Sequence, residues 1–253
     1  MNSAKGKIPL QKERNCESNF EYYDELAKTL SSDTLDPLEM ISNFAIYAPR
    51  QFLTDFLVRY ELFKLIRDVS GSVLEFGVMG GQGLMSMAQF SAILEPTNLN
   101  REIIGFDTFE GFPSVSKKDG TSTVVKKGMY RVDGSYERLI KAIKLYDANR
   151  FIGHVNKVSI VKGDVKNTLP DYLNANPHLV AALVYFDLDL YEPTKFVLKT
   201  ILERIPQGAI VAFDEVNHRS FPGETLALSE VLGIDKIKLQ RIPFCSRISY
   251  FIR

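Results

Sequence analysis

Acidic residues follow two apolar runs in the second half of the chain. The run ending at residue 186 is followed by Asp187 and Asp189, and the run ending at residue 213 by Asp214 and Glu215. If both runs are strands of a parallel sheet, they end at one edge, where ligands of such sheets bind. Carboxylates gathered there repel one another unless a cation lies among them or one carries a proton. All-oxygen ligands suit Mg²⁺, Mn²⁺ or Ca²⁺ rather than Zn²⁺, so we predict a hard divalent metal at this edge.

A glycine-rich turn follows an earlier apolar run. Its sequence is Glu75-Phe-Gly77-Val-Met-Gly-Gly81, which does not match the G-x-G-x-x-G fingerprint of dinucleotide-binding proteins. Glycines after a strand let the backbone approach a ligand closely. An acid two residues before Gly77 suits the ammonium group of an amino acid better than a pyrophosphate. The competing interpretation is a tight strand-to-helix turn without a ligand.

Two further acids stand at the predicted ends of the second and third strands. Asp107 precedes Thr108, and Asp164 follows Gly163. An acid at the end of the second strand is the usual partner of ribose hydroxyls, although Asp107 is also compatible with a helix cap. Asp164 is equally suited to accept from an adenine amino group or to cap the next helix. Acids at three consecutive strand ends favour a nucleoside-containing ligand.

The elements that must position these residues are strands alternating with helices after Gly71. This alternation predicts a doubly wound parallel sheet with right-handed crossovers. Two final strands are separated by only a few residues, which is too short for a parallel crossover and predicts an antiparallel hairpin. The predicted strands are Ser72–Val78, Glu102–Asp107, Lys157–Val161, Ala181–Asp187, Ala209–Asp214, Lys236–Ile242 and Ser246–Ile252.

The segments outside this alternation are less regular. Residues 1 to about 20 are polar and predicted to be a flexible tail, whereas Glu21–Arg67 is predicted to be helical. Aromatic residues in that region recur at helical spacing, which indicates core or subunit packing, with a substrate lid as the alternative. Gly111–Asn156 begins as an exposed loop and is either a lid or surface decoration. We therefore divide the chain into a helical extension, 1–70, and a main domain, 71–253. The aromatic residues are Phe52, Phe56, Tyr60 and Phe63.

Composition limits the class of protein. The 253 residues are 45% hydrophobic, and 31 basic residues balance 31 acidic ones without a basic block, so nothing favours nucleic-acid binding. Cys16 and Cys245 lack metal-type spacing and are predicted to be reduced thiols. Charges interrupt every apolar run before it reaches membrane-spanning length. The N-terminus lacks the apolar core of a signal peptide, and we expect a soluble, cytoplasmic protein that binds neither membrane nor nucleic acid.

Together these motifs resemble the macrocin O-methyltransferase family, which methylates sugar hydroxyls on natural products and glycans. The resemblance extends from about residue 75 to 223. Its strongest part is the block Asp-x-Asp-x-Tyr-Glu-x-Thr. The matching pieces are Glu75-Phe-Gly-Val-Met-Gly-Gly, Asp107-Thr-Phe-Glu-Gly-Phe-Pro, Gly163-Asp-Val-Lys-Asn-Thr-Leu-Pro, Phe186-Asp-Leu-Asp-Leu-Tyr-Glu-Pro-Thr and Phe213-Asp-Glu.

The resemblance implies a fold, two cofactors and a set of site residues. The fold is a Rossmann-like class I methyltransferase sheet of seven strands, five parallel plus the hairpin, with helices on both faces. The cofactors are S-adenosylmethionine and Mg²⁺, the acceptor carries a sugar, and the protein is a homodimer. Asp187, Asp214 and Glu215 would hold the metal, and Asp189 would be the general base beside Asp187. The implied S-adenosylmethionine contacts are Glu75, Gly77, Gly81, Asp107, Thr108, Gly163, Asp164 and Asp187.

Two positions depart from the family pattern. Glu215 stands where a second aspartate is usual, and Asp164 stands where an aromatic residue often packs on adenine. His218 is predicted to be a surface-loop residue, with acceptor contact as the alternative. Tyr191 and Glu192 either shape the acceptor pocket or start a helix.

Two other functions remain open at the level of sequence. A metal-dependent hydrolase would use the same acids to activate water, and a non-catalytic cofactor-binding homologue would retain only the fold. The acceptor is equally open among a nucleotide-linked sugar, a glycan, a glycosylated natural product and a phenolic diol, and an amino sugar would be methylated on nitrogen. Specificity depends on loops that the sequence does not define.

Overall fold

The computed structural model describes residues 17–123 and 125–253, and the chain divides into two compact units, one up to Leu53 and one from Thr54 to Arg253. The helical region predicted for Glu21–Arg67 is confirmed. Asp36 starts one of its helices by accepting a hydrogen bond from the Leu38 amide at 2.8 Å, with Pro37 in the first helical position. The predicted flexible tail falls largely on residues 1–16, outside the described residues. The helices here are α1 (Glu17–Ser32), α2 (Pro37–Ser42), α3 (Phe44–Tyr47) and α4 (Arg50–Leu65).

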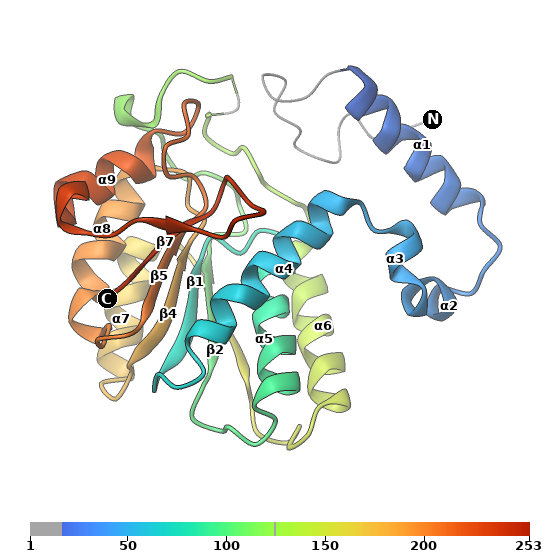
Figure 1. Ribbon diagram of the computed structural model, residues 1–253, viewed down its shortest axis with the longest axis horizontal. Coiled ribbons are helices and arrows are strands. Elements are labelled where there is room, and N and C mark those ends of the chain that lie inside the picture. Colours follow the sequence, from blue (N-terminus) through green and yellow to red (C-terminus); the bar gives the residue numbers. More distant parts are fainter. Residues whose placement is uncertain (1–16, 124) are drawn as a thin grey trace. The chain divides into compact units, whose positions relative to one another are not determined.

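A mixed sheet forms the centre of the second unit (Figure 1). Within the described ranges it has seven strands in the order β3-β2-β1-β4-β5-β7-β6. The first five are parallel, and the last two form the antiparallel hairpin predicted for the C-terminus. The predicted fold class is confirmed. The strands are β1 (Ser72–Phe76), β2 (Ile103–Asp107), β3 (Val158–Lys162), β4 (Ala181–Phe186), β5 (Ile210–Phe213), β6 (Gln240–Arg241) and β7 (Ser249–Ile252).

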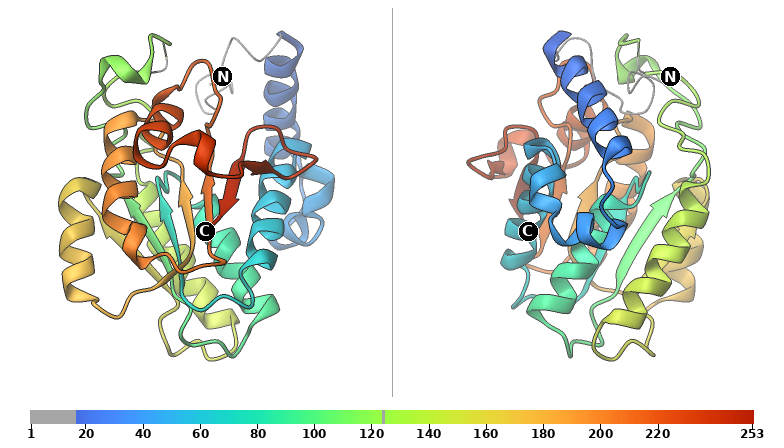
Figure 2. Two further views of the ribbon diagram at one scale, coloured as in Figure 1. Left: turned by 60° about the vertical axis from the view of Figure 1, so that its left-hand side comes forward. Right: turned by 90° about the vertical axis from the view of Figure 1, so that its right-hand side faces the viewer.

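Helices cover both faces of this sheet, as Figure 2 shows with α4 and α5 on one side and α7 and α8 on the other. Successive strand residues point to opposite faces. Val73 and Tyr185 therefore pack in one core cluster with α4, α5 and α6, while Leu74 and Phe186 pack in the other with α7, α8 and α9. The remaining helices are α5 (Gln82–Leu94), α6 (Ser135–Asn149), α7 (Val165–Ala175), α8 (Tyr191–Ile201) and α9 (Gly223–Leu232).

Strand boundaries differ from the prediction at the edge strand β6 and at the central strand β1. The strand predicted for Lys236–Ile242 is wrong in extent, because Lys236 lies in the 3₁₀ turn η4 (Ile234–Lys236) and β6 pairs with β7 over two residues only. As an edge strand, β6 has a single neighbour to hold it. β1 ends at Phe76 because Gly77 turns the chain at φ 92°.

The segment Gly111–Asn156 contains regular structure that its opening residues do not reveal. It begins as a loop with the 3₁₀ turn η2 (Lys117–Asp119) and then forms α6. Ser116 and Asp119 make a capping box around η2, and the buried Asp119 also accepts a hydrogen bond from the Tyr191 amide at 2.6 Å. The loop is thereby attached to the first residue of α8.

Candidate active site

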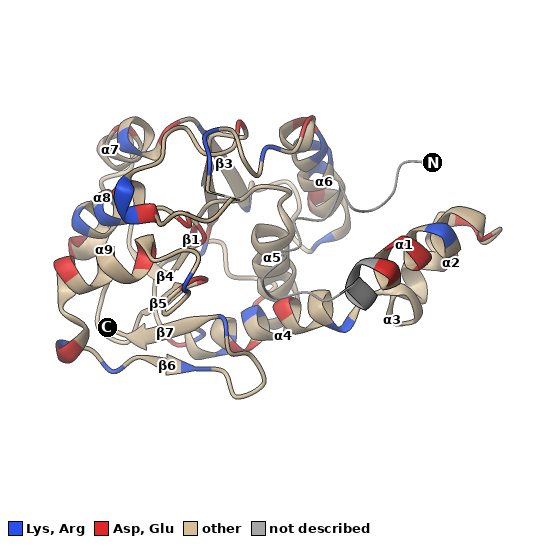
Figure 3. Ribbon diagram, turned by 90° about the horizontal axis from the view of Figure 1, so that it is seen from above, with Lys and Arg blue, Asp and Glu red and all other residues tan. Residues whose placement is uncertain are grey.

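The carboxyl edge of the sheet brings the two acid-bearing segments together. Phe186 and Phe213 are register partners in β4 and β5, so Asp187 and Asp214 follow them side by side. Two backbone bonds fix this arrangement: Asp187 donates to the Phe76 carbonyl at 2.8 Å and Asp214 to the Phe186 carbonyl at 3.0 Å. Seen from above, acidic segments lie around the ends of β1, β4 and β5 (Figure 3). The predicted convergence of these segments follows from the parallel register.

A buried glutamate holds the two segments in place. Glu224, at the start of α9, is fully buried and accepts backbone hydrogen bonds from Leu188 at 3.2 Å, Asp189 at 3.3 Å and Glu215 at 3.0 Å. Three amide donors on one carboxylate compensate the loss of water around it. Burial nevertheless raises the pKa of Glu224 well above its ordinary value, with the charge of Asp189 adding to the effect. The sequence gives no local signal for this role, because Glu224 reads as an ordinary first-turn acid of a helix.

Asp189 lies in a tight turn that ends the strand alternation. Its φ of 60° is left-handed, and the Leu190 amide donates to the Leu188 carbonyl at 2.6 Å across it. Aspartate tolerates this conformation better than most side chains. Burial, and then the charge of Asp214, raise the pKa of Asp189 to about 7. A carboxyl group with such a pKa is suited to exchange protons near neutral pH.

Two arginines that the sequence prediction did not include neutralise part of the acidic charge. The buried Arg59 of α4 lies 3.8 Å from Glu75 and 3.7 Å from Asp187, with its guanidinium 4.7 Å from the centre of the Tyr185 ring. Arg247, between β6 and β7, pairs with Asp214. Neither arginine lies in a sequence motif, and only the packing of α4 and the hairpin against the sheet brings them here.

The acids predicted as metal ligands do not form a metal centre as they stand. Over the described part of the chain, no three His, Cys, Asp or Glu side chains are arranged to hold a metal ion. Asp214 accepts from the Tyr185 hydroxyl at 2.7 Å and from Arg247, while Glu215 faces His218 at 3.4 Å. Their donor chemistry still fits a hard cation, because carboxylate oxygens are the ligands that such ions prefer. Burial, with Asp214 as the next cause, raises the pKa of Asp187 well above its ordinary value.

The histidine beside this cluster lies inside the protein. His218 is 5% exposed, and its ring centre lies 5.4 Å from that of Phe221. The predicted surface position of His218 is therefore wrong. The reason is that the loop after β5 does not project into solvent, because the Glu215 amide bonds to Glu224 at the start of α9. Glu215 and Phe221 then lie against the imidazole.

The glycine-rich turn is closely packed against the rest of the edge. A Cβ on Gly77 would lie 1.9 Å from the Asp187 carbonyl oxygen, and one on Gly81 would lie 2.5 Å from Leu139. Asp107 accepts from the amides of Val78 at 2.6 Å and Met79 at 2.7 Å, so this carboxylate holds the turn instead of capping a helix.

Glu75 lies beneath the turn with part of its hydrogen-bonding capacity unused. Its side chain is 4% exposed, and its Oε2 atom has no hydrogen-bond partner. Burial raises the pKa of Glu75 to about 7, against the opposing effect of Arg59. A buried carboxylate oxygen without a donor is a suitable acceptor for a ligand ammonium group.

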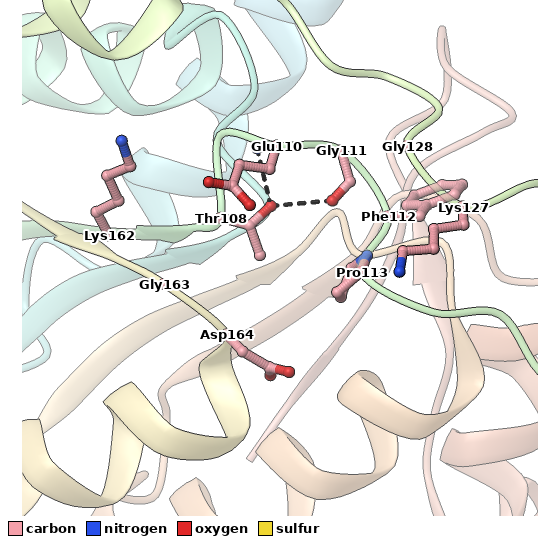
Figure 4. Close-up of a pocket in the computed structure, with 10 residues that line it drawn as sticks. All are labelled: Thr108, Glu110, Gly111, Phe112, Pro113, Lys127, Gly128, Lys162, Gly163 and Asp164. Atoms are coloured by element: carbon pink, nitrogen blue, oxygen red, sulfur yellow. Dashed lines mark hydrogen bonds between the residues drawn. The ribbon is translucent and has the colours of Figure 1, made fainter.

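A cavity of about 490 Å³ opens beside the ends of β2 and β3 (Figure 4). Thr108, Gly163 and Asp164, three of the predicted contacts, line it. Thr108 donates to the Gly111 carbonyl at 2.9 Å, and Asp164 caps α7 by accepting from the Lys166 amide at 3.0 Å. Of the two roles open for Asp164, the structure shows the helix cap. Thr108 directly follows Asp107, whose carboxylate holds the glycine-rich turn.

The strand order, the terminal antiparallel hairpin and the glycine-rich turn after the first strand define the Rossmann-like class I methyltransferases. The family model for macrocin O-methyltransferase matches residues 62–227, and the chain belongs to this family. The predictions of the family and of a methyltransferase are thereby confirmed.

Solved structures agree with this assignment. CalS11, calicheamicin methyltransferase, is 37% identical with a TM-score of 0.91, and 94% of each chain is covered. An apo structure of CalS11, TDP-rhamnose 3'-O-methyltransferase, is 34% identical with a TM-score of 0.83, covering 94% of this chain and 96% of that one. The O-methyltransferase NovP, at 20% identity and a TM-score of 0.58 over 82% of this chain and 81% of its own, shares the fold. No curated protein sequence matches the chain significantly.

Proposed function

We propose that this protein transfers a methyl group from S-adenosylmethionine to a hydroxyl of a sugar or sugar-containing metabolite. The observation that carries the proposal is the similarity to CalS11 along 94% of the chain, because that protein is a TDP-rhamnose 3'-O-methyltransferase. A nucleotide-linked sugar is the acceptor that this similarity favours. The acid-bearing edge and the cavity are consistent with a donor and an acceptor meeting above the sheet.

The proposed donor site runs from the glycine-rich turn to the cavity. Glu75 offers its buried oxygen to the ammonium group, and Gly77 and Gly81, both at positive φ, allow the tight turn that closes over it. Asp107 accepts two amide hydrogen bonds on Oδ2 and one from the Phe109 amide on Oδ1, so Oδ1 retains a lone pair that can accept from a ribose hydroxyl. Thr108, Gly163 and Asp164 would surround the adenine. Asp187 belongs to the acidic edge, and its backbone packs against Gly77 of this site.

We also propose Mg²⁺ as a cofactor, held by Asp187, Asp214 and Glu215. Support comes from the oxygen-only donor set and from the excess of buried negative charge around Asp187. A bound Mg²⁺ would lower the pKa of the acceptor hydroxyl. The longer side chain of Glu215 faces His218, so its contribution depends on a change of rotamer.

The chemistry assigned to this chain is positioning and proton removal. Methyl transfer is an in-line displacement, so the main requirement is that the hydroxyl oxygen, the methyl carbon and the sulfonium lie in a line. Asp189 would accept the hydroxyl proton, and its pKa of about 7 is suited to that task. Glu224 and Asp119 hold the backbone around Asp189 through the amides of residues 189 and 191.

Two further properties belong to the proposal. A homodimer is supported by the exposed apolar residues of α2 and α3, among them Leu38 and Ile46. None of the described helices is long and apolar enough to cross a membrane. The cytoplasmic location and the lack of nucleic-acid binding stay predictions from sequence.

Calorimetric titration with S-adenosylmethionine and S-adenosylhomocysteine, each with and without Mg²⁺, tests the proposal. We expect micromolar binding of both, followed by methylation of nucleotide-linked sugars with a vicinal diol. If neither molecule binds under any condition, the methyl-donor assignment is wrong, and metal-dependent hydrolysis becomes the function to examine.

A further inference from the structure

Arg247 links three elements at the acidic edge. It lies in the connection between β6 and β7, and its guanidinium contacts Asp214 through Nη1 and Asp55 of α4 through Nη2, the latter at 2.8 Å. The Asp214 side chain is 2% exposed, whereas those of Arg247 and Asp55 are each 32% exposed. The guanidinium thus extends from the solvent side to a buried carboxylate.

Both carboxylate oxygens of Asp214 already have a hydrogen-bond partner in this arrangement. Its Oδ1 atom accepts from the Tyr185 hydroxyl at 2.7 Å, and its Oδ2 atom is bound by Arg247. Tyr185 is rigid, because its ring is buried beneath the Arg59 guanidinium. The Arg247 side chain is 32% exposed and has a second partner, so Arg247 is the group that can leave Asp214 at lower cost.

The two contacts of Arg247 differ in what they provide. Asp214 belongs to the proposed metal-binding set, but Asp55 lies on α4 and has no part in that set. A guanidinium presents its donors in a planar fork, so it can keep one carboxylate partner while turning away from another. Asp55 is therefore the carboxylate that Arg247 can keep as its partner when it leaves Asp214.

We infer that Arg247 is a built-in cation that occupies Asp214 in the metal-free protein and that it gives up this contact, keeping its contact with Asp55, when a divalent cation binds. The inference rests on the proposed metal site. It assigns Arg247 and Asp55 a regulatory role, because the affinity for the metal then depends on competition between a guanidinium and the ion. An arginine that only braced the hairpin against α4 would affect stability and leave the metal affinity unchanged.

The test is a titration of the full-length protein with Mn²⁺, followed by electron paramagnetic resonance of the free ion and repeated with Mg²⁺ by calorimetry. Arg247→Met is expected to bind Mn²⁺ about tenfold more tightly than the wild type, because a charge-assisted contact no longer competes. Arg241→Met is the matched control, since Arg241 lies in the same hairpin and contacts the Pro243 carbonyl. Arg247→Lys keeps the positive charge but lacks the planar guanidinium. Its affinity for Mn²⁺ is expected to lie between those of the wild type and Arg247→Met. It replaces Arg247→Met in the comparison if that variant is unfolded.

Asp55 distinguishes this exchange from a general effect of charge. Asp55→Asn is expected to weaken Mn²⁺ binding in the wild type, because Arg247 then has only Asp214 as partner. In the Arg247→Met background the same substitution is expected to have no effect, whereas a purely long-range effect would persist there. If Asp55→Asn changes the Mn²⁺ affinity equally in the wild-type and Arg247→Met backgrounds, the proposed exchange is wrong.

The remaining outcomes separate this inference from the proposed function. Equal affinities for the wild type, Arg247→Met and Arg241→Met would refute the role of Arg247 and leave the metal site standing. If the wild type binds weakly and Arg247→Met binds well, the inference is supported. Failure of every variant to bind Mn²⁺ or Mg²⁺ would remove the metal from the proposed function, and the inference with it.

Discussion

At the scale of single residues, the site depends on a few carboxylates placed in unlike surroundings. Asp214 is bound on both oxygens, Glu224 is occupied by backbone amides, and Asp189 is held in a left-handed turn with its pKa raised to about 7. Groups of one chemical type therefore have different functions because their partners differ. Among them, Asp189 is the carboxylate best suited to accept a proton.

Asp189→Asn is the direct test of that assignment. The amide cannot take up the hydroxyl proton, so we expect kcat to fall by about 10² to 10⁴ while the affinity for S-adenosylmethionine is unchanged. Steady-state kinetics and calorimetry on the same preparation give both quantities. Asp171→Asn, at an exposed position of α7, is the control and should keep full activity. Wild-type turnover in Asp189→Asn would show that another group removes the proton.

Single-residue chemistry was only partly predictable from the sequence. Asp187 and Asp214 are recognisable because each follows an apolar strand, and parallel register alone then brings them together. Arg59 and Arg247 were not recognisable, because their roles arise from α4 and the terminal hairpin packing against the same edge. No local pattern distinguishes them from the other arginines of the chain.

At the scale of elements, the strand-to-helix turn after β1 requires glycine at one position and tolerates a side chain at another. In Gly77→Ala the new Cβ would lie 1.9 Å from the Asp187 carbonyl oxygen, at a φ of 92°. We expect a loss of roughly 2 kcal/mol or more in the free energy of unfolding, with weaker cofactor binding. Gly80→Ala meets no atom within 4 Å and should change stability by less than about 0.5 kcal/mol. Urea denaturation of both variants checks this, and equal stabilities would contradict it.

A charged network ties the loop after β2 to α8 and α9. Glu230 accepts from Lys118 at 2.5 Å, from Lys195 at 2.8 Å and from the Tyr191 hydroxyl at 2.5 Å. The Lys118 contact, followed by those of Lys195 and Tyr191, lowers the pKa of Glu230 to about 2 from its ordinary 4.5. Tyr191 is therefore the first residue of α8, and its hydroxyl takes part in this network. These contacts support the helix-start alternative for Tyr191 and not the acceptor-pocket alternative.

This network predicts an acid-dependent loss of stability. Because the pKa of Glu230 is lower in the folded protein, its stabilisation is complete above pH 4.5 and is lost as pH falls toward 2. The difference in urea midpoint between the wild type and Glu230→Gln should therefore shrink by more than half between pH 6 and pH 3. The control is Glu192→Gln, which replaces an exposed acid of α8. A difference that is the same at both pH values would mean that the network does not exist in solution.

At the scale of the whole molecule, the order of elements was the most predictable property. Alternating apolar runs and amphipathic helices after Gly71 require a parallel sheet, and a short terminal connection requires a hairpin. The extent of β6 was not predictable, because an edge strand ends where its single neighbour stops pairing. The helix α6 was obscured by the polar loop that precedes it. The assignment of residues 1–70 as an extension for dimer contacts or a lid stays a prediction.

The oligomeric state is the remaining property at this scale. Leu38 and Ile46, in α2 and α3, are each 76% exposed, and neighbouring Ile41 and Phe44 are 68% and 57% exposed. Apolar residues this exposed and this close in sequence are typical of a surface that a partner covers. We expect the wild type to be a dimer by light scattering, and the double variant Leu38→Asp, Ile46→Asp to be a monomer with unchanged circular dichroism. Leu145→Asp, at a 73% exposed position of α6, is the control and should remain dimeric. A monomeric wild type, or a double variant that stays dimeric, would exclude these helices as the dimer contact.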